Sequence, residues 1–143
     1  MLVVLDTNVL VSGLLNSFGS PGRIVDLVIA GSLRLAFDDR VLAEYRAVLA
    51  RPRFKLDAAA VADLLEFLEE RGARVLAGPL PGPFPDDADA KFLEVAAAAA
   101  AEALVTGNSR HFPAEVCRGI AVVTPAVFLA SLTSAAPGSP SRG

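Results

Sequence analysis

Short runs of apolar residues alternate along this chain with longer stretches in which apolar residues recur at helical spacing. The first run, Leu2–Leu5, is continuous and stops at an aspartate, which is typical of a strand buried on both faces. Comparable runs predict further strands at residues 33–37, 73–77, 103–106 and 120–124. Apolar strands that alternate with helices indicate an α/β fold, in which a parallel sheet carries helices on both faces.

The predicted helices begin at capping residues and stop at glycine. Asp38 and Asp57 each precede a helical pattern that they can cap, and Gly31 and Gly72 each follow one. We predict helices at residues 7–15, 21–30, 39–50, 58–71, 86–101 and 125–132. Together these elements form a single domain over residues 1–133. Residues 134–143 are Ser, Pro, Gly, Ala and Arg, and we expect a flexible tail there.

The composition narrows the possible chemistry. With 53% apolar and 20% charged residues among 143, the chain is not of the disordered class. Its one cysteine excludes an internal disulfide framework and a multi-cysteine metal site, and its one histidine excludes a histidine-rich centre. A catalytic metal would therefore need mostly carboxylate ligands, which favours Mg²⁺ or Mn²⁺.

The net charge of −3 argues against indiscriminate electrostatic binding to nucleic acid. It does not exclude a nuclease, because an acidic metal site itself contributes negative charge. The sequence has no run of ~18 apolar residues without charge, and no basic segment precedes the first apolar run. We therefore expect a cytoplasmic protein that does not enter a membrane.

Two aspartates occupy positions at which a functional carboxylate can lie. Asp6 follows the first strand directly, and sites in parallel sheets form at the carboxyl ends of strands. It could equally be a turn residue or a helix cap. Asp89 falls on the same helical face as Phe92, Leu93 and Ala96, and a buried carboxylate needs a partner. The same periodicity predicts a solvated face for Asp87, Lys91 and Glu94.

A third acid and a polar turn complete the set of candidates. Glu44 lies at the margin of an apolar helix face, where it could also be a solvated residue paired with Arg40. Clustered carboxylates repel one another, and a divalent cation relieves that repulsion. Thr106 and Asn108 follow the predicted fourth strand, either as an ordinary turn or as a hydroxyl and an amide beside the same crevice.

Taken together, four segments resemble the PIN-domain family, and most closely its VapC-type branch of toxins from toxin–antitoxin pairs. They are LDTNVLVSGLL from Leu5, LAEYRAVLARPRF from Leu42, PDDADAKFLEVA from Pro85 and LVTGNSRHF from Leu104. The resemblance implies a three-layer α/β/α sandwich. It also implies Mg²⁺- or Mn²⁺-dependent hydrolysis of RNA phosphodiester bonds by an endoribonuclease.

By motif, the resemblance assigns Asp6, Glu44 and Asp89 as catalytic and metal-binding acids. Asn108 stands where many relatives have a fourth acid, which puts a second metal position in doubt. The same motifs line the site with Thr7, Asn8, Asp86, Thr106 and Asn108.

RNA phosphates require cations nearby, and the densest basic stretch of the chain is Arg51, Arg53 and Lys55, with Phe54 available for base stacking. Arg110 and His111 lie beside the expected site. Each of these groups could also be an ordinary surface or structural residue. The resemblance implies an RNA substrate, an antitoxin partner and a homodimer.

Asn108 motivates an alternative, a catalytically weak or inactive PIN-like module that binds RNA or protein. A receiver-like phosphoacceptor domain fits poorly, because Asp6 is followed by Thr7 and no lysine follows Glu115.

Overall fold

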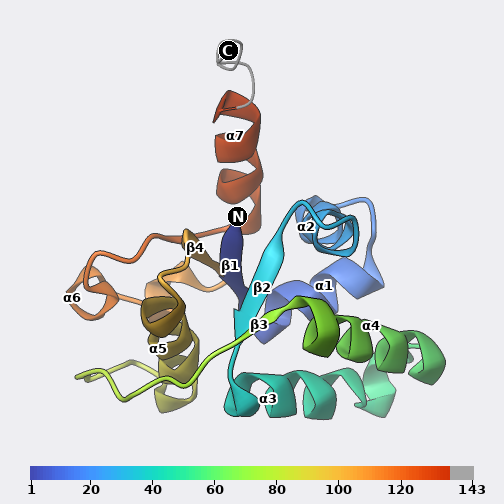
Figure 1. Cartoon of the computed structure of the whole chain (residues 1–143), viewed down its shortest axis with the longest axis horizontal. Helices are drawn as coiled ribbons and strands as arrows, with labels where there is room; N and C mark the ends of the chain where they lie inside the picture. Colours follow the sequence, from blue (N-terminus) through green and yellow to red (C-terminus); the bar gives the residue numbers. More distant parts are fainter. Residues whose placement is uncertain (136–143) are drawn as a thin grey trace.

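The computed structural model describes residues 1–135, and its centre is a sheet of five parallel strands (Figure 1). The spatial order of the strands is β3-β2-β1-β4-β5. The α/β/α architecture predicted from the sequence is confirmed, with seven helices in the described part of the chain. The strands are β1 (Leu2–Leu5), β2 (Arg34–Phe37), β3 (Ala73–Arg74), β4 (Ala103–Val105) and β5 (Val122–Val123).

The helices lie on both sides of the strands. In Figure 1, α5 and α6 lie on one side and α1, α2 and α4 on the other. The last helix continues two residues into the segment predicted as a tail, and residues 136–143 lie outside the described part. The helices are α1 (Thr7–Leu15), α2 (Ser20–Ile29), α3 (Asp39–Leu49), α4 (Ala58–Arg71), α5 (Ala90–Ala99), α6 (Ala114–Cys117) and α7 (Pro125–Ala135).

The register between β1 and β4 determines where the site forms. Val3, Val4 and Leu5 are 0% exposed, as expected for a central parallel strand covered on both faces. Leu5 pairs with Val105, so both strands end at the same level, and the Asp6 amide donates to the Val105 carbonyl at 2.9 Å. The strand order reverses between β1 and β4, and in sheets of this kind ligands bind at that point.

The fifth helix differs from its prediction. Asp86–Asp89 does not belong to the α-helix, because Asp87–Asp89 forms a separate 3₁₀ turn and α5 begins at Ala90. The Asp86 carboxylate accepts a hydrogen bond from the Ala88 amide at 3.0 Å. Asp89 is the N-cap residue of α5 and keeps a right-handed helical backbone, with φ of −81° and ψ of −20°.

The predicted solvated face of this helix is wrong at Lys91 and Glu94, although Asp87 is exposed as predicted. Residues 92–96 are all buried, since α5 packs against β1, β2 and β4 on one side and against α3 on another. Glu94 is 6% exposed and accepts hydrogen bonds from Arg40 at 2.8 Å and from the Leu80 amide at 3.0 Å. The Lys91 side chain is also largely buried. Along residues 92–96 the helix therefore presents no solvated face.

Two predicted helix caps are confirmed. Asp38 accepts from the Val41 amide at 2.9 Å, and Asp57 accepts from the Ala60 amide at 3.0 Å. Among residues 1–135, no helix combines the length and the apolar character needed to cross a lipid bilayer.

Candidate functional site

Asp6 is a buried acid at the carboxyl end of β1. It occupies the N-cap position of α1, yet its side chain makes no capping bond. The Asp6 carboxylate instead accepts from the Thr106 hydroxyl at 2.7 Å and, at a longer 3.4 Å, from the Asn8 amide. Asp6 is only 6% exposed and Thr106 is 0% exposed. The carboxylate is therefore directed across the sheet edge towards β4.

The Asn8 side chain links the residue after β1 to the turn after β4. While its amide nitrogen donates to Asp6, its side-chain oxygen accepts from the Gly107 amide at 3.2 Å. The backbone N–H of Asn108 in turn donates to the Thr106 hydroxyl at 3.0 Å. The polar turn after β4 thus fixes Asp6, and Asn108 itself is exposed.

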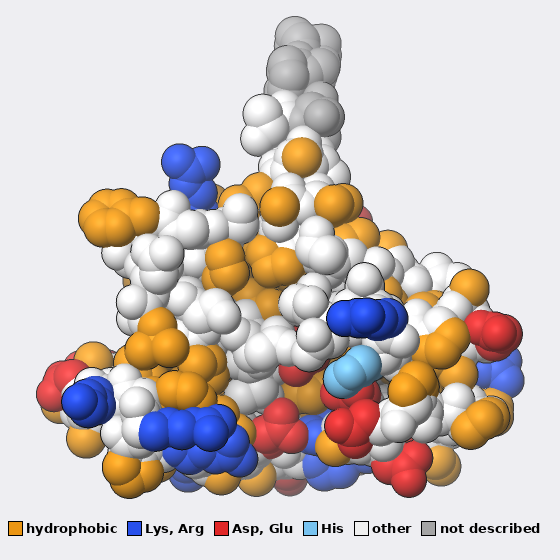
Figure 2. All heavy atoms as spheres, turned by 180° about the vertical axis from the view of Figure 1, so that it is seen from behind, with side chains coloured by type: hydrophobic (Ala, Val, Ile, Leu, Met, Phe, Trp, Pro, Cys, Tyr) orange, Lys and Arg blue, Asp and Glu red, His pale blue; other side chains and the backbone are white. Residues whose placement is uncertain are grey.

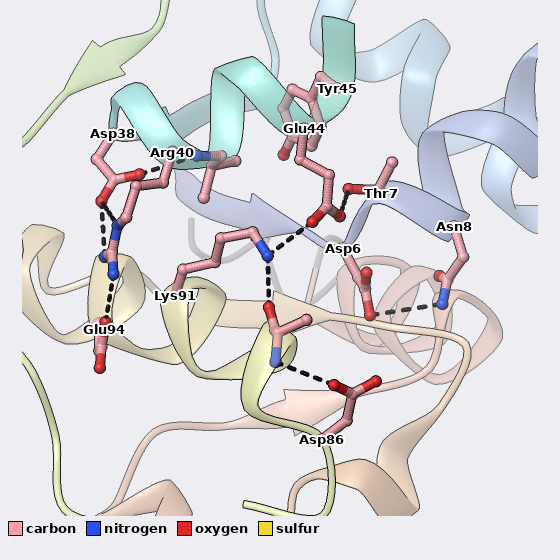
Figure 3. A network of polar contacts seen from close by, with 12 residues as sticks. Asp6, Thr7, Asn8, Asp38, Arg40, Glu44, Tyr45, Asp86, Lys91 and Glu94 are labelled. Carbon is pink, nitrogen blue, oxygen red and sulfur yellow. Dashed lines mark hydrogen bonds and ion pairs between the residues drawn. The ribbon is translucent and has the colours of Figure 1, made fainter. Parts of the chain in front are cut away.

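Glu44 approaches the same crevice from α3. One of its carboxylate oxygens accepts from the Thr7 hydroxyl, and the other lies 2.6 Å from Lys91 Nζ (Figure 3). Arg40, which the sequence offered as a partner for a solvated glutamate, pairs instead with Asp38 and Glu94. Glu44 therefore belongs to the crevice and not to the solvated side of its helix.

Asp89 lies at the junction between its 3₁₀ turn and α5. One carboxylate oxygen is 2.8 Å from His111 Nδ1, and the side chain is 13% exposed. In the described part of the chain, Asp86, Asp89 and His111 each offer one ligand atom within 4.8 Å of the others. In Figure 2 the chain's single histidine (pale blue) borders a group of acidic side chains (red).

The charges of these acids act on one another. The pKa of Asp6 is raised mainly by burial; the Thr106 hydrogen bond opposes this, and the charges of Asp89 and Glu44 add to it. Burial also raises the pKa of Asp89, against the opposing hydrogen bond with His111. Three acids from β1, α3 and the turn before α5 are therefore close enough to interact electrostatically.

Tyr45 forms a buried hydrogen bond with the end of β1. Its hydroxyl donates to the Leu5 carbonyl at 2.5 Å, and the residue is 0% exposed. Burial, together with the nearby charges of Asp6 and Glu44, raises the pKa of Tyr45.

An open pocket of about 470 Å³ extends from the acids towards the segment after α3. Arg51, Arg53 and Phe54 line it together with Asp6, Thr7, Asn8 and Glu44. The Arg53 guanidinium lies over the Phe54 ring, 4.9 Å from its centroid, so one face of that ring is already covered. Arg51 and Arg53, two of the three basic residues in the predicted stretch, thus lie beside the acidic crevice.

The remaining predicted residues lie elsewhere. Lys55 adopts a left-handed conformation, with φ of 53°, and lines a separate pocket between α3 and α4. Arg110 is exposed in the turn Ser109–His111. Lys91 is a member of the site that sequence periodicity did not predict. Its position two residues after Asp89 could have indicated this role, but helical periodicity placed it on the solvated face.

The donor set fits a hard divalent cation. It consists of carboxylate oxygens with one imidazole nitrogen at the edge, and at least one carboxylate, that of Asp6, is buried without a cationic partner among its hydrogen bonds. A bound cation would offset the burial and repulsion that raise the pKa of Asp6.

Comparison with known protein families gives one assignment. The sequence profile of the PIN domain matches residues 2–110, which include both central strands, the acids and the turn after β4. No curated protein matches the chain.

Proposed function

Because this chain belongs to the PIN-domain family, whose members are typically nucleases, we propose that it is a divalent-metal-dependent endoribonuclease. One observation carries the proposal. Asp6, Glu44 and Asp89 come from separate elements and interact electrostatically, with Asp6 buried at the point where the strand order reverses. Burying and clustering carboxylates is costly without a cation.

In this proposal Asp6 and Asp89 would hold one Mg²⁺ or Mn²⁺ ion, and Asp86 and His111 could offer further ligand atoms beside Asp89. When bound, such an ion lowers the pKa of a coordinated water and neutralises charge on a phosphoryl oxygen. Thr106 and Asn8 hold Asp6 in place. His111 holds Asp89. Mg²⁺ usually keeps several waters and takes one or two protein carboxylates, so this set suffices for a single ion.

Arg51 and Arg53 support a nucleic-acid substrate, because they line the pocket that contains the acids. Their charges offset backbone phosphates. Arg53 rests on Phe54, so the outer face of its guanidinium, and not the phenyl ring, offers the stacking surface for an unpaired base. We therefore propose single-stranded RNA as the substrate form.

The test compares two neighbouring aspartates. Asp89→Asn removes a carboxylate of the site, whereas Asp87→Asn changes an exposed residue of the same turn. We expect wild type and Asp87→Asn to cleave a labelled single-stranded RNA in Mn²⁺ and to stop when EDTA is added. Asp89→Asn should lose at least ~100-fold in rate. Equal loss in both variants would contradict the assigned site.

A second candidate function is an RNA- or protein-binding module with little or no cleavage. Asn108 favours it, because a neutral amide replaces the charge that a further acid would bring to the exposed edge of the crevice. In the same assay, RNA binding by a folded wild type without cleavage in either Mn²⁺ or Mg²⁺ would support this module and reject the nuclease.

We further propose that the protein is the cytoplasmic toxin of a toxin–antitoxin pair and acts as a homodimer. The segments quoted in the sequence analysis support this branch of the family. A small DNA-binding protein encoded by the neighbouring reading frame, which forms a complex with this chain and suppresses its cleavage of RNA, is the expected finding. Unhindered cleavage in the presence of that neighbour's product would reject the toxin role.

A further inference from the structure

Lys91 lies inside the acidic crevice. Its side chain is 14% exposed, and Nζ is 2.6 Å from a carboxylate oxygen of Glu44. The ammonium also donates to the Ala88 carbonyl and lies over the Phe92 ring, 4.9 Å from its centroid. A carboxylate, a carbonyl and an aromatic face thus surround it, and Figure 3 shows it between Glu44 and the turn that precedes α5. Lys91 is held in place and does not extend into solvent.

Glu44 has both of its carboxylate oxygens engaged. Thr7 donates to one, and Lys91 pairs with the other. In the described part of the chain, the group of ligand atoms that lie within 4.8 Å of one another consists of Asp86, Asp89 and His111 and does not include Glu44. A divalent ion that bound Glu44 directly would have to displace the ammonium or share a carboxylate with it, against the repulsion of like charges.

We infer that Lys91 is a resident cation of this centre: it neutralises Glu44 in place of a second divalent ion and limits the protein to one ion, held by Asp6 and Asp89. This inference rests on the proposed nuclease function. Asn108 is an independent feature that favours the same outcome, since it adds no charge to attract a second ion. Lys91 is then a positioning residue, which acts on the reaction through Glu44.

The wild-type protein permits a direct test, because Lys91 and Lys55 are its only two lysines. With ¹³C,¹⁵N-labelled lysine, NMR resolves both ammonium groups, and Lys55→Arg assigns them. We expect the Lys91 ammonium and Cε methylene signals to remain those of a restrained, slowly exchanging group at saturating Mg²⁺. If Mg²⁺ converts them to solvated signals like those of Lys55, the ion has replaced Lys91 and the inference is wrong.

Titration calorimetry with Mn²⁺ tests the same point by counting ions. Wild type and Lys91→Arg should bind one ion, whereas Lys91→Met should gain a second ion at least ~10-fold tighter than any second binding in wild type. Lys55→Met is the matched control, and it should leave the number of ions unchanged. If Lys91→Met does not fold, the NMR result on wild type decides.

The outcomes separate the inference from the proposed function. One ion bound equally by all folded variants overturns the role of Lys91 and leaves the nuclease proposal standing. No Mn²⁺ bound by any variant at millimolar concentration overturns both.

Discussion

At the scale of single residues, the site is defined by which partner each acid finds. Asp6 follows β1 at a position where an aspartate commonly caps a helix, yet it bonds to Thr106 across the sheet. Glu44 could have been solvated, yet it bonds to Thr7 and Lys91. Each choice depends on a residue that is distant in sequence, and each directs a carboxylate into the crevice.

The raised pKa of Asp6 predicts a pH dependence of stability in the metal-free protein. When the folded-state pKa of an acid exceeds its unfolded value, the folded form binds the proton more tightly. The free energy of unfolding then decreases as pH rises from about 4, near the unfolded value, through the folded-state pKa. Asp6→Asn should therefore stabilise the metal-free protein at pH 7, by about 1.4 kcal/mol for each pKa unit of the shift.

Urea unfolding in EDTA at pH 4 and pH 7 checks this expectation. The advantage of Asp6→Asn over wild type should shrink as the pH falls towards 4, because a raised folded-state pKa lets the folded protein take up the proton first. Asp87→Asn, an exposed residue, serves as the control and should follow wild type. A variant at position 6 that is less stable than wild type at pH 7 would show that the Thr106 hydrogen bond outweighs burial.

Asn108 gives a second prediction at this scale. An amide offers a neutral oxygen to a cation, whereas aspartate also brings a charge. Asn108→Asp should tighten the binding of a second Mn²⁺ ion and, if two ions act on one phosphate, raise the rate of RNA cleavage. Calorimetry and initial rates on one RNA measure both effects. Unchanged affinity and rate would leave Asn108 as a turn residue after β4.

At the scale of elements, the site depends on how α3 and α5 are joined to the central strands. α3 carries Glu44 towards the crevice and, one residue later, places the Tyr45 hydroxyl on the carbonyl of Leu5. α5 packs on β1, β2 and β4 and brings Asp89 to the sheet edge. The position of the turn Asp87–Asp89 therefore depends on α5, the helix that follows it and packs against the sheet.

Tyr45→Phe tests the connection between α3 and β1. The change removes a buried hydrogen bond one residue before Asp6 and should cost about 1 kcal/mol of stability. Because the end of β1 positions Asp6, Mn²⁺ affinity should also fall. Val28→Ala, in the buried face of α2, is a control that should lower stability without changing the affinity of the folded protein. Equal Mn²⁺ affinity in all three proteins would contradict the connection.

At the scale of the whole molecule, the five strands form a single sheet. Ion binding at the carboxyl ends of its central strands should therefore stabilise the entire domain. A ligand that binds only the folded state adds about 2.7 kcal/mol at 100 times its dissociation constant. For a domain of this size, that corresponds to a rise in Tm of roughly 5–11 °C. Thermal unfolding with millimolar Mn²⁺ measures it, and Asp89→Asn should abolish the shift. A wild-type Tm that Mn²⁺ leaves unchanged would count against a metal site.

Local sequence patterns are enough to predict the outline of this fold. Residues of the continuous apolar run Leu2–Leu5 point alternately to both faces of a strand, so both faces must be covered, and the run forms the central strand. Asp38 and Asp57 capped their helices because capping needs only a side-chain oxygen and an amide three residues away. Interactions of this range can be read from spacing alone.

Long-range packing sets the arrangement of side chains inside the site. The helical-face prediction for α5 assumed one buried face and one solvated face, but packing on two sides buried five consecutive residues. That enclosure brought Lys91 to Glu44 and Glu94 to Arg40, pairs separated by 47 and 54 residues in sequence. Periodicity reports only the angle between residues of one helix. What surrounds that helix depends on chain segments that only folding brings together.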